Sequence, residues 1–250
     1  MSETNERRCL LAENCRLAGG DKCNNHCGAF IAMHGLDGAG GRAGSANMPA
    51  NYRLTTLNNS PVRESQQKVY DMLDAYTKTF SRQFGDEDSK RIKSMYLWST
   101  SPGTGKTTTA SALLNEWLRV HYIGSIKRGK QPIQQPTYFL DVNEWQTDYN
   151  LATMTDDDEA MAKIKADIKQ CQNVPYLVMD DIGVRGATEA FRAYLHAIIN
   201  HRTAAGMPTV YTSNLPIEDM ERVFDRRLYD RMRDQCVVVP FAGESKRGGK

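Results

Sequence analysis

The segment Ser99–Thr108 has the residue types and spacing of a phosphate-binding loop, and it stands between an expected strand and an expected helix. Gly103 and Gly105 let backbone N–H groups turn toward phosphate oxygens, and the start of the following helix adds its positive dipole end. Lys106 has the charge to reach the β- and γ-phosphates, and the Thr107 hydroxyl is a ligand for Mg²⁺. The expected nucleotide-binding residues are Pro102, Gly103, Thr104, Gly105, Lys106, Thr107 and Thr108.

Thr100 is one departure from the usual pattern G-x-x-x-x-G-K-[ST], because it stands where the first glycine falls. That position opens the loop, whereas Gly103 and Gly105 approach the phosphates most closely. We therefore expect the altered loop still to bind. The alternative is a glycine-rich turn between strand and helix with no ligand.

Two carboxylates follow the apolar run Tyr176–Met179 and supply the acidic partner that such a loop requires. We expect Asp180 to lie beside the loop and hold the Mg²⁺ shell. Asp181 is expected to face the γ-phosphate and orient or deprotonate water. Because Asp is one methylene shorter than the Glu common at this position, we expect slow hydrolysis. The alternative is that both acids only cap the turn after the strand.

Asn214 ends a further expected strand, in the stretch Thr209–Pro216. Its side chain could hydrogen-bond the attacking water or the γ-phosphate from a neighbouring strand. The alternative is an Asx turn before Pro216.

Four of the six cysteines fall within the first 27 residues, at Cys9, Cys15, Cys23 and Cys27. Four clustered thiolates suit a tetrahedral structural Zn²⁺ site, and His26 could replace Cys27 as a ligand. A module this short has too little core to fold alone, so the metal would supply its folding energy. The alternative is a disordered tail with reduced cysteines.

The rest of the chain must position these groups, and its pattern predicts an α/β fold with a parallel five-stranded sheet flanked by helices. The expected strands are 95–98, 138–142, 176–179, 209–212 and 237–239. Helices are expected over 66–84, 107–122 and 188–202. Residues 1–34 form the cysteine-rich module, and 35–61 read as a flexible linker because glycine, asparagine and serine crowd there.

The composition agrees with a globular protein in the cytoplasm. The 250 residues are 40% hydrophobic and 25% charged, with net charge +2, which is no nucleic-acid signature in bulk. Neither an apolar leader nor a run long enough to cross a membrane is evident, so we expect no membrane partner.

Three stretches together resemble an AAA+ ATPase, namely Ser101–Thr107, Met179–Gly183 and Pro208–Pro216. More narrowly, they resemble the DnaC/DnaI-type helicase loaders and their IstB-like transposition relatives. Two other stretches support this: Arg227–Met232 resembles the family's R-x-x-D-R-[ML], and Gly243–Arg247 its closing G-x-S-x-R. The resemblance covers roughly residues 62–248.

The resemblance implies roles for individual residues. Asn214 matches the sensor I residue. Arg231 matches the arginine finger that enters a neighbouring subunit's ATP site, with Arg227 as second candidate. Arg247 matches a sensor II-like group. Because these loaders lack the helical lid of larger AAA+ proteins, 62–250 is expected to be an AAA+ ATPase domain without one.

The function that the resemblance implies is ATP-dependent loading of a DnaB-type hexameric replicative helicase onto single-stranded DNA at replication initiation. ATP and Mg²⁺ would assemble copies of the chain into an oligomeric switch, and the zinc module would grip the helicase. Two alternatives remain open. One is an IstB-like transposition ATPase that binds duplex DNA, and the other is a non-hydrolysing adaptor or inhibitor of a helicase.

Overall fold

Five short strands form one parallel sheet, as the sequence predicted, and their order is β2-β3-β4-β1-β5. The computed structural model describes residues 4–85, 90–183 and 186–243. The strands are β1 (Ser94–Trp98), β2 (Thr137–Asp141), β3 (Tyr176–Asp180), β4 (Thr209–Ser213) and β5 (Cys236–Pro240). Asp141 pairs with Asp180, and Trp98 pairs with Ser213, so the carboxyl ends of these strands lie level.

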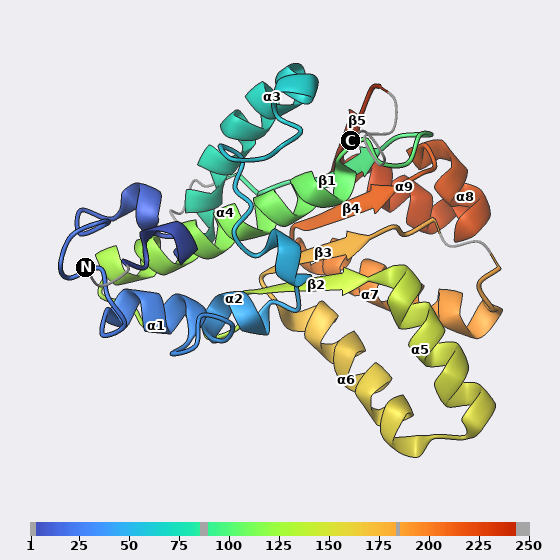
Figure 1. Cartoon of the computed structure of the whole chain (residues 1–250). Helices are drawn as coiled ribbons and strands as arrows, with labels where there is room; N and C mark the ends of the chain where they lie inside the picture. Colours follow the sequence, from blue (N-terminus) through green and yellow to red (C-terminus); the bar gives the residue numbers. More distant parts are fainter. Residues whose placement is uncertain (1–3, 86–89, 184–185, 244–250) are drawn as a thin grey trace.

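Helices cover both faces of the sheet (Figure 1). On one face lies α4 (Lys106–Lys127), whose Trp117 stacks on Tyr176 of β3 with ring centroids 4.5 Å apart. The opposite face is covered by α6 (Asp158–Asn173), α7 (Glu189–Ala205) and α9 (Arg226–Gln235). Each face therefore has its own apolar core, and β3 is buried from both sides, as the apolar run predicted.

Between β2 and α6 lies α5 (Val142–Thr155), which the sequence analysis did not predict. It begins directly at the end of β2, because the Asp141 carboxylate accepts hydrogen bonds from the backbone N–H groups of Asn143 and Glu144. The start of α5 is thereby fixed at the carboxyl edge of the sheet, beside Asp180.

The remaining elements flank this sheet. The helix expected over 66–84 begins as α3 (Gln67–Thr77) and then tightens into a 3-10 segment, η5 (Lys78–Phe84). Shorter pieces are η4 (Glu64–Gln66), η6 (Ile217–Asp219) and α8 (Met220–Val223). No helix in the described ranges has both the length and the apolar character needed to cross a membrane.

Residues upstream of 62 are packed against α4 and do not form the flexible linker that we expected. They include η1 (Glu6–Arg8), η2 (Ala12–Asn14), α1 (Gly28–His34), α2 (Gly41–Ser45) and η3 (Ala50–Tyr52). Leu10, Met33, Met48 and Leu57 share one apolar core with α4 and the sheet. The boundaries expected at residues 34 and 61 therefore do not separate independent cores.

The glycine content misled the linker prediction, because glycine here serves close packing. At Gly41, with φ +62°, an added Cβ would lie 2.6 Å from the backbone carbon of Met33. The neighbouring Arg42 is buried and donates to the carbonyls of Ala32, Pro132 and Ile133. These hydrogen bonds tie the segment to the chain that precedes β2.

Candidate functional site

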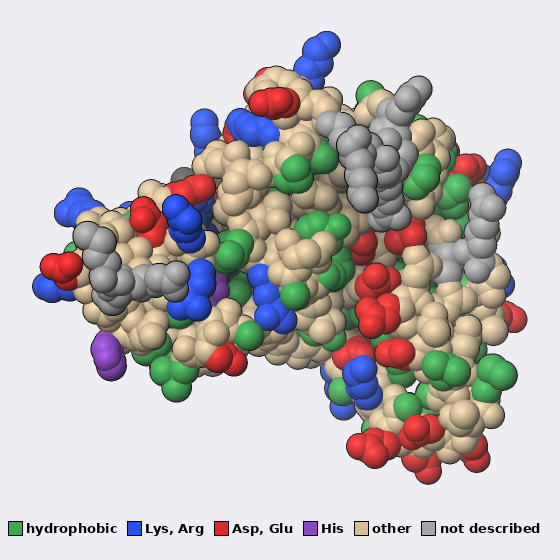
Figure 2. All heavy atoms as spheres, viewed as in Figure 1, with side chains coloured by type: hydrophobic (Ala, Val, Ile, Leu, Met, Phe, Trp, Pro, Cys, Tyr) green, Lys and Arg blue, Asp and Glu red, His purple; other side chains and the backbone are tan. Residues whose placement is uncertain are grey.

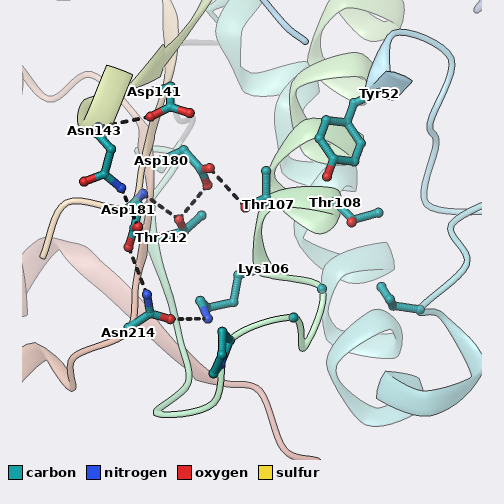
Figure 3. Close-up of a pocket in the computed structure, with 14 residues that line it drawn as sticks. Tyr52, Lys106, Thr107, Thr108, Asp141, Asn143, Asp180, Asp181, Thr212 and Asn214 are labelled. Carbon is teal, nitrogen blue, oxygen red and sulfur yellow. Dashed lines mark hydrogen bonds between the residues drawn. The ribbon is translucent and has the colours of Figure 1, made fainter. Parts of the chain in front are cut away.

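A cavity of about 420 Å³ lies at the carboxyl ends of β2, β3 and β4, beside the first turn of α4 (Figure 3). This is the edge at which parallel sheets usually bind ligands. Nine residues expected at the site line it: Pro102, Gly103, Gly105, Lys106, Thr107, Thr108, Asp180, Asp181 and Asn214. Thr104 does not line the cavity; its side chain is buried beside it in the loop.

Asp180 is buried at the end of β3 and lies against the loop, as predicted. Its two carboxylate oxygens accept hydrogen bonds from Thr107 Oγ1 at 3.0 Å and Thr212 Oγ1 at 2.6 Å. Burial raises the pKa of Asp180 to about 6, although both hydroxyls oppose the rise. Nearby Asp141 and Asp181 raise this pKa further. A cation placed between Thr107 and Asp180 would relieve that cost, so the two residues fit a Mg²⁺ site.

Lys106, Asn214 and Asp181 form a chain of hydrogen bonds across the cavity (Figure 3). Lys106 Nζ donates to Asn214 Oδ1 at 2.8 Å, and Asn214 Nδ2 donates to Asp181 Oδ1 at 3.2 Å. The other carboxylate oxygen of Asp181 accepts from Asn143 Nδ2 at 2.6 Å. Three separate strand ends and the loop thus supply one connected set of polar groups.

Asp181 has a left-handed backbone, with φ +59°. Such a conformation costs a non-glycine residue free energy, although Asp tolerates it better than most. Its N–H donates to Thr212 Oγ1 at 2.8 Å, which helps to hold the strained turn. The turn presents the Asp181 carboxylate to the cavity between two amide side chains.

The loop itself has the backbone that its glycines predict. Gly103 and Gly105 have φ of +73° and +99°, and Gly105 is the residue from which α4 begins. Among the described non-glycine residues, positive φ occurs only at Asn47, Asp156 and Asp181. Thr100 therefore adopts a conformation open to any residue, and no glycine is needed there.

The arginines singled out from the sequence lie outside this cavity. Arg231 is on α9 and donates to Asn200 Oδ1 on α7. Arg227 is exposed on the same helix. Arg247 lies outside the described residues. Neither Arg227 nor Arg231 lines the cavity of its own chain.

The four clustered cysteines line a separate small cavity of about 20 Å³ at the N-terminal end. Burial raises the pKa of the Cys9 thiol, and the nearby thiols of Cys27, Cys15 and Cys23 raise it further. However, no group of three or more His, Cys, Asp or Glu side chains among the described residues is placed to hold a metal ion. The four predicted zinc ligands therefore lie around one cavity, but the described residues do not have the geometry of a metal site.

Five cavity residues were not predicted as site residues: Tyr52, Val62, Asp141, Asn143 and Thr212. Asp141 lies near the end of the expected strand 138–142 and Asn143 directly follows it, and this was an available signal because parallel strands end at one edge. Tyr52 lies upstream of the expected ATPase domain, and Val62 is the first residue of that domain. No local pattern links them to the loop.

Part of the sequence is similar to a protein of known function. The chain is 28% identical over 153 residues to the replicative helicase loader DnaC of Escherichia coli strain K12, which is 61% of this chain and 55% of the relative. The chain is homologous to DnaC. It spans about half the length of the curated relatives that it matches. No protein-family model matches the sequence.

Solved structures show the same fold. The DnaC helicase loader has a TM-score of 0.53 at 20% identity, over 78% of this chain and 100% of that one. A putative primosome component from Streptococcus pyogenes serotype M3 has a TM-score of 0.55 at 21% identity, over 82% and 97%. The parallel five-stranded sheet with its flanking helices is thus the fold that these solved structures share.

Proposed function

We propose that the chain is a Mg²⁺-dependent ATPase that loads a replicative helicase onto single-stranded DNA. The observation that carries the proposal is the connected set Lys106–Asn214–Asp181 beside the Thr107–Asp180 pair, in one cavity at the carboxyl ends of three strands. The homology to a replicative helicase loader supports the assignment of the partner.

Mg²⁺ would neutralise phosphate charge, and Thr107 and Asp180 are the residues that would hold it. Acidic side chains gather around the mouth of the cavity and along the start of α5, as Figure 2 shows, and Asp141 and Asp181 are among those that line it. Such a field repels a bare triphosphate. The metal complex is therefore the form of ATP that the site accepts.

The chain's own groups can position the terminal phosphate and the water that attacks it. A γ-phosphate near Lys106 would compete with Asn214 Oδ1 for the ammonium group, so Asn214 would respond to whether that phosphate is present. Asp181 would accept a hydrogen bond or a proton from the water, and Asn143 and Asn214 would hold its carboxylate in place. The short Asp side chain is consistent with slow turnover.

Self-assembly would complete the site. Because Arg231 does not line the cavity of its own chain, we assign it to the ATP site of a neighbouring copy, where it would stabilise transition-state charge. ATP binding would then favour the assembled form, and hydrolysis would release it. In this scheme the oligomer is the state that acts on the helicase and on DNA.

The cysteine-lined segment is the part that we assign to helicase contact. Four thiols around one cavity are consistent with Zn²⁺ drawing them together, with Cys9, Cys15, Cys23 and Cys27 as ligands. His26 is exposed, outside the residues that line this cavity. His34 is buried, and its Nε2 accepts the Leu10 N–H at 3.0 Å.

Replacing Lys106 with Ala tests the activity. We expect wild-type protein to bind Mg-ATP and release phosphate slowly, and the variant to lose at least about tenfold in turnover because it loses the charge at the β- and γ-phosphates. Lys127→Ala, at the far end of α4, is the matched control and should turn over normally. Wild-type protein that neither binds nor hydrolyses ATP would overturn the proposal.

The loading activity needs its own assay. A hexameric replicative helicase is placed on circular single-stranded DNA with and without the protein, and unwinding is measured. We expect stimulation that depends on ATP and disappears with Lys106→Ala. Preferential binding to duplex DNA, without an effect on the helicase, would favour a transposition ATPase instead.

A further inference from the structure

The nucleotide cavity has two chemically different ends (Figure 3). At one end lie the polar groups of the strand ends, among them Asp180, Asp181 and Asn214. Across the first turn of α4 lie Tyr52 and Val62, an aromatic ring and a branched aliphatic side chain. The Tyr52 ring points toward Thr107 and Thr108. The far end is therefore suited to a flat, apolar group.

The position at which the loop binds the phosphates decides which part of a nucleotide would lie beside Tyr52 and Val62. The loop lysine and the metal-binding groups take the β- and γ-phosphates. A triphosphate with its last phosphate near Lys106 and Asp180 must therefore direct its nucleoside away from them. In this cavity that direction leads past Thr108 to Tyr52.

We propose that Tyr52 and Val62 form the wall of the base subsite, with Tyr52 stacking against the base of the bound nucleotide. This inference rests on the proposed nucleotide binding and adds to it a contact from the N-terminal part of the chain. Nucleotide bases stack on aromatic side chains whatever the base, because every base has a π-face. Tyr52 therefore contributes affinity for a nucleoside rather than for phosphate.

The wall is fixed by contacts with α4. Asn115 is buried on that helix, and its Nδ2 donates to the carbonyls of Tyr52 at 2.9 Å and Thr55 at 2.8 Å. At the other end of the wall, an added Cβ on Gly105 would lie 2.8 Å from the methyl groups of Val62. Asn115 is thus a positioning residue, because it holds the backbone that carries Tyr52.

The test compares two ligands on the full chain. Mg-ATP and Mg-tripolyphosphate are titrated into wild type, Tyr52→Ala and Tyr52→Phe by calorimetry. We expect Tyr52→Ala to weaken ATP about tenfold, the size of one lost base–aromatic contact. It should leave tripolyphosphate unchanged, and Tyr52→Phe should bind both as wild type does. Tyr194→Ala removes a half-buried aromatic on α7 outside the cavity and should change neither.

The outcomes separate the two proposals. If wild type binds ATP and Tyr52→Ala binds it equally well, the base wall is wrong while nucleotide binding stands. Equal weakening of ATP and tripolyphosphate would also overturn the wall, because it would show general damage to the site. Wild type that binds neither ligand refutes the proposed function itself.

Asn115→Ala provides a second variant with a fold check by thermal unfolding. A folded variant should show the same split as Tyr52→Ala, weaker for ATP and unchanged for tripolyphosphate. If the folded variant instead loses affinity for both ligands to the same extent, Asn115 does not act through Tyr52.

Discussion

Asp180 combines burial with a proposed metal-binding role that requires charge. Its carboxyl group lies between two hydroxyls and close to Asp141 and Asp181, and its pKa is raised to about 6. Near neutral pH the protein therefore holds a carboxylate at a cost, which a bound cation would offset. The residue that would hold the metal is also one that weakens the fold without it.

The pH dependence of stability follows with a definite sign. Because the folded pKa of Asp180 lies above its unfolded value, its stabilising effect is present at low pH and is lost as pH rises through about 6. Without nucleotide at pH 8, we expect the free energy of unfolding of Asp180→Asn to exceed that of wild type by up to about 2–3 kcal/mol. Urea denaturation measures this difference. At pH 5 the difference should shrink.

The affinity for Mg-ATP should have the opposite pH dependence to stability, since it should be greater above pH 6 than below it. Asp180→Asn should lose Mg-dependent ATP affinity, and wild-type affinity should fall below pH 6 because protons compete with the metal. Thr212→Val removes a hydroxyl partner of Asp180 and should raise the apparent pKa of that binding further. A variant Asp180→Asn less stable than wild type at both pH values would contradict this account.

At the scale of elements, the sheet could be predicted and its surroundings only in part. Apolar runs such as Tyr176–Met179 identify the five strands, because central parallel strands are buried on both faces. The start of α5 was missed, since Asp141 caps it from within a strand that ends in the site. The segment 35–61 was wrongly predicted to be flexible, because composition cannot show that Gly41 packs against Met33.

The residues of the candidate site likewise divide into those that could be predicted from the sequence and those that could not. Lys106, Thr107, Asp180 and Asn214 follow recognisable strand or loop ends, so their meeting could be predicted from parallel topology. Tyr52 reaches the cavity from upstream of the loop, and Asn115, far along the chain, donates to its carbonyl. Long-range contacts of this kind have no local signature in a single sequence.

The α9 helix carries a prediction about assembly. Asp225 caps the helix, and Leu228 and Met232 are buried beneath it, which fixes its orientation and places Arg231 beside α7. We expect Arg231→Ala to lower ATP turnover with little change in ATP affinity. If Arg231 acts on a neighbouring copy, its removal takes away a contact made in the transition state at that copy's site. The contacts that bind ATP in the ground state remain.

Mixing the two impaired variants Lys106→Ala and Arg231→Ala tests whether Arg231 acts between copies. Lys106→Ala retains its arginine and Arg231→Ala retains its loop, so the mixture should regain part of the turnover that neither has alone. Arg233→Ala, an exposed arginine on the same helix, is the control and should behave as wild type. No recovery in a mixture that still assembles would exclude action in trans.

At the scale of the whole molecule, the N-terminal segment and the sheet share one apolar core. Glu13 joins them on the surface, because it accepts hydrogen bonds from Arg119 on α4 at 2.6 Å and from Asn58 at 3.0 Å. The segment that carries the four clustered cysteines and the sheet whose strand ends line the larger cavity therefore pack together as one body.

Under the proposed zinc assignment, loss of the metal should therefore affect the stability of the whole protein. We expect about one zinc ion per purified chain, and a strong chelator should lower the melting temperature of the entire molecule in a single transition. Replacing Cys9, Cys15, Cys23 and Cys27 together with Ser should give the same lowered value, with no further effect of chelator. Purified wild type without zinc, and with a melting temperature unaffected by added metal, would show that the cysteines have no metal role.

The packing of the first sixty residues has a practical consequence for anyone who divides this chain. Helix α4 is buried on nearly all sides, including the side covered by Leu10, Met48 and Leu57. A fragment that begins at residue 62 would expose that apolar stripe to water. It would be expected to aggregate, although it contains every residue of the phosphate loop. Proteolysis of the intact chain should likewise spare the glycine-rich stretch that composition marks as the obvious place to cut.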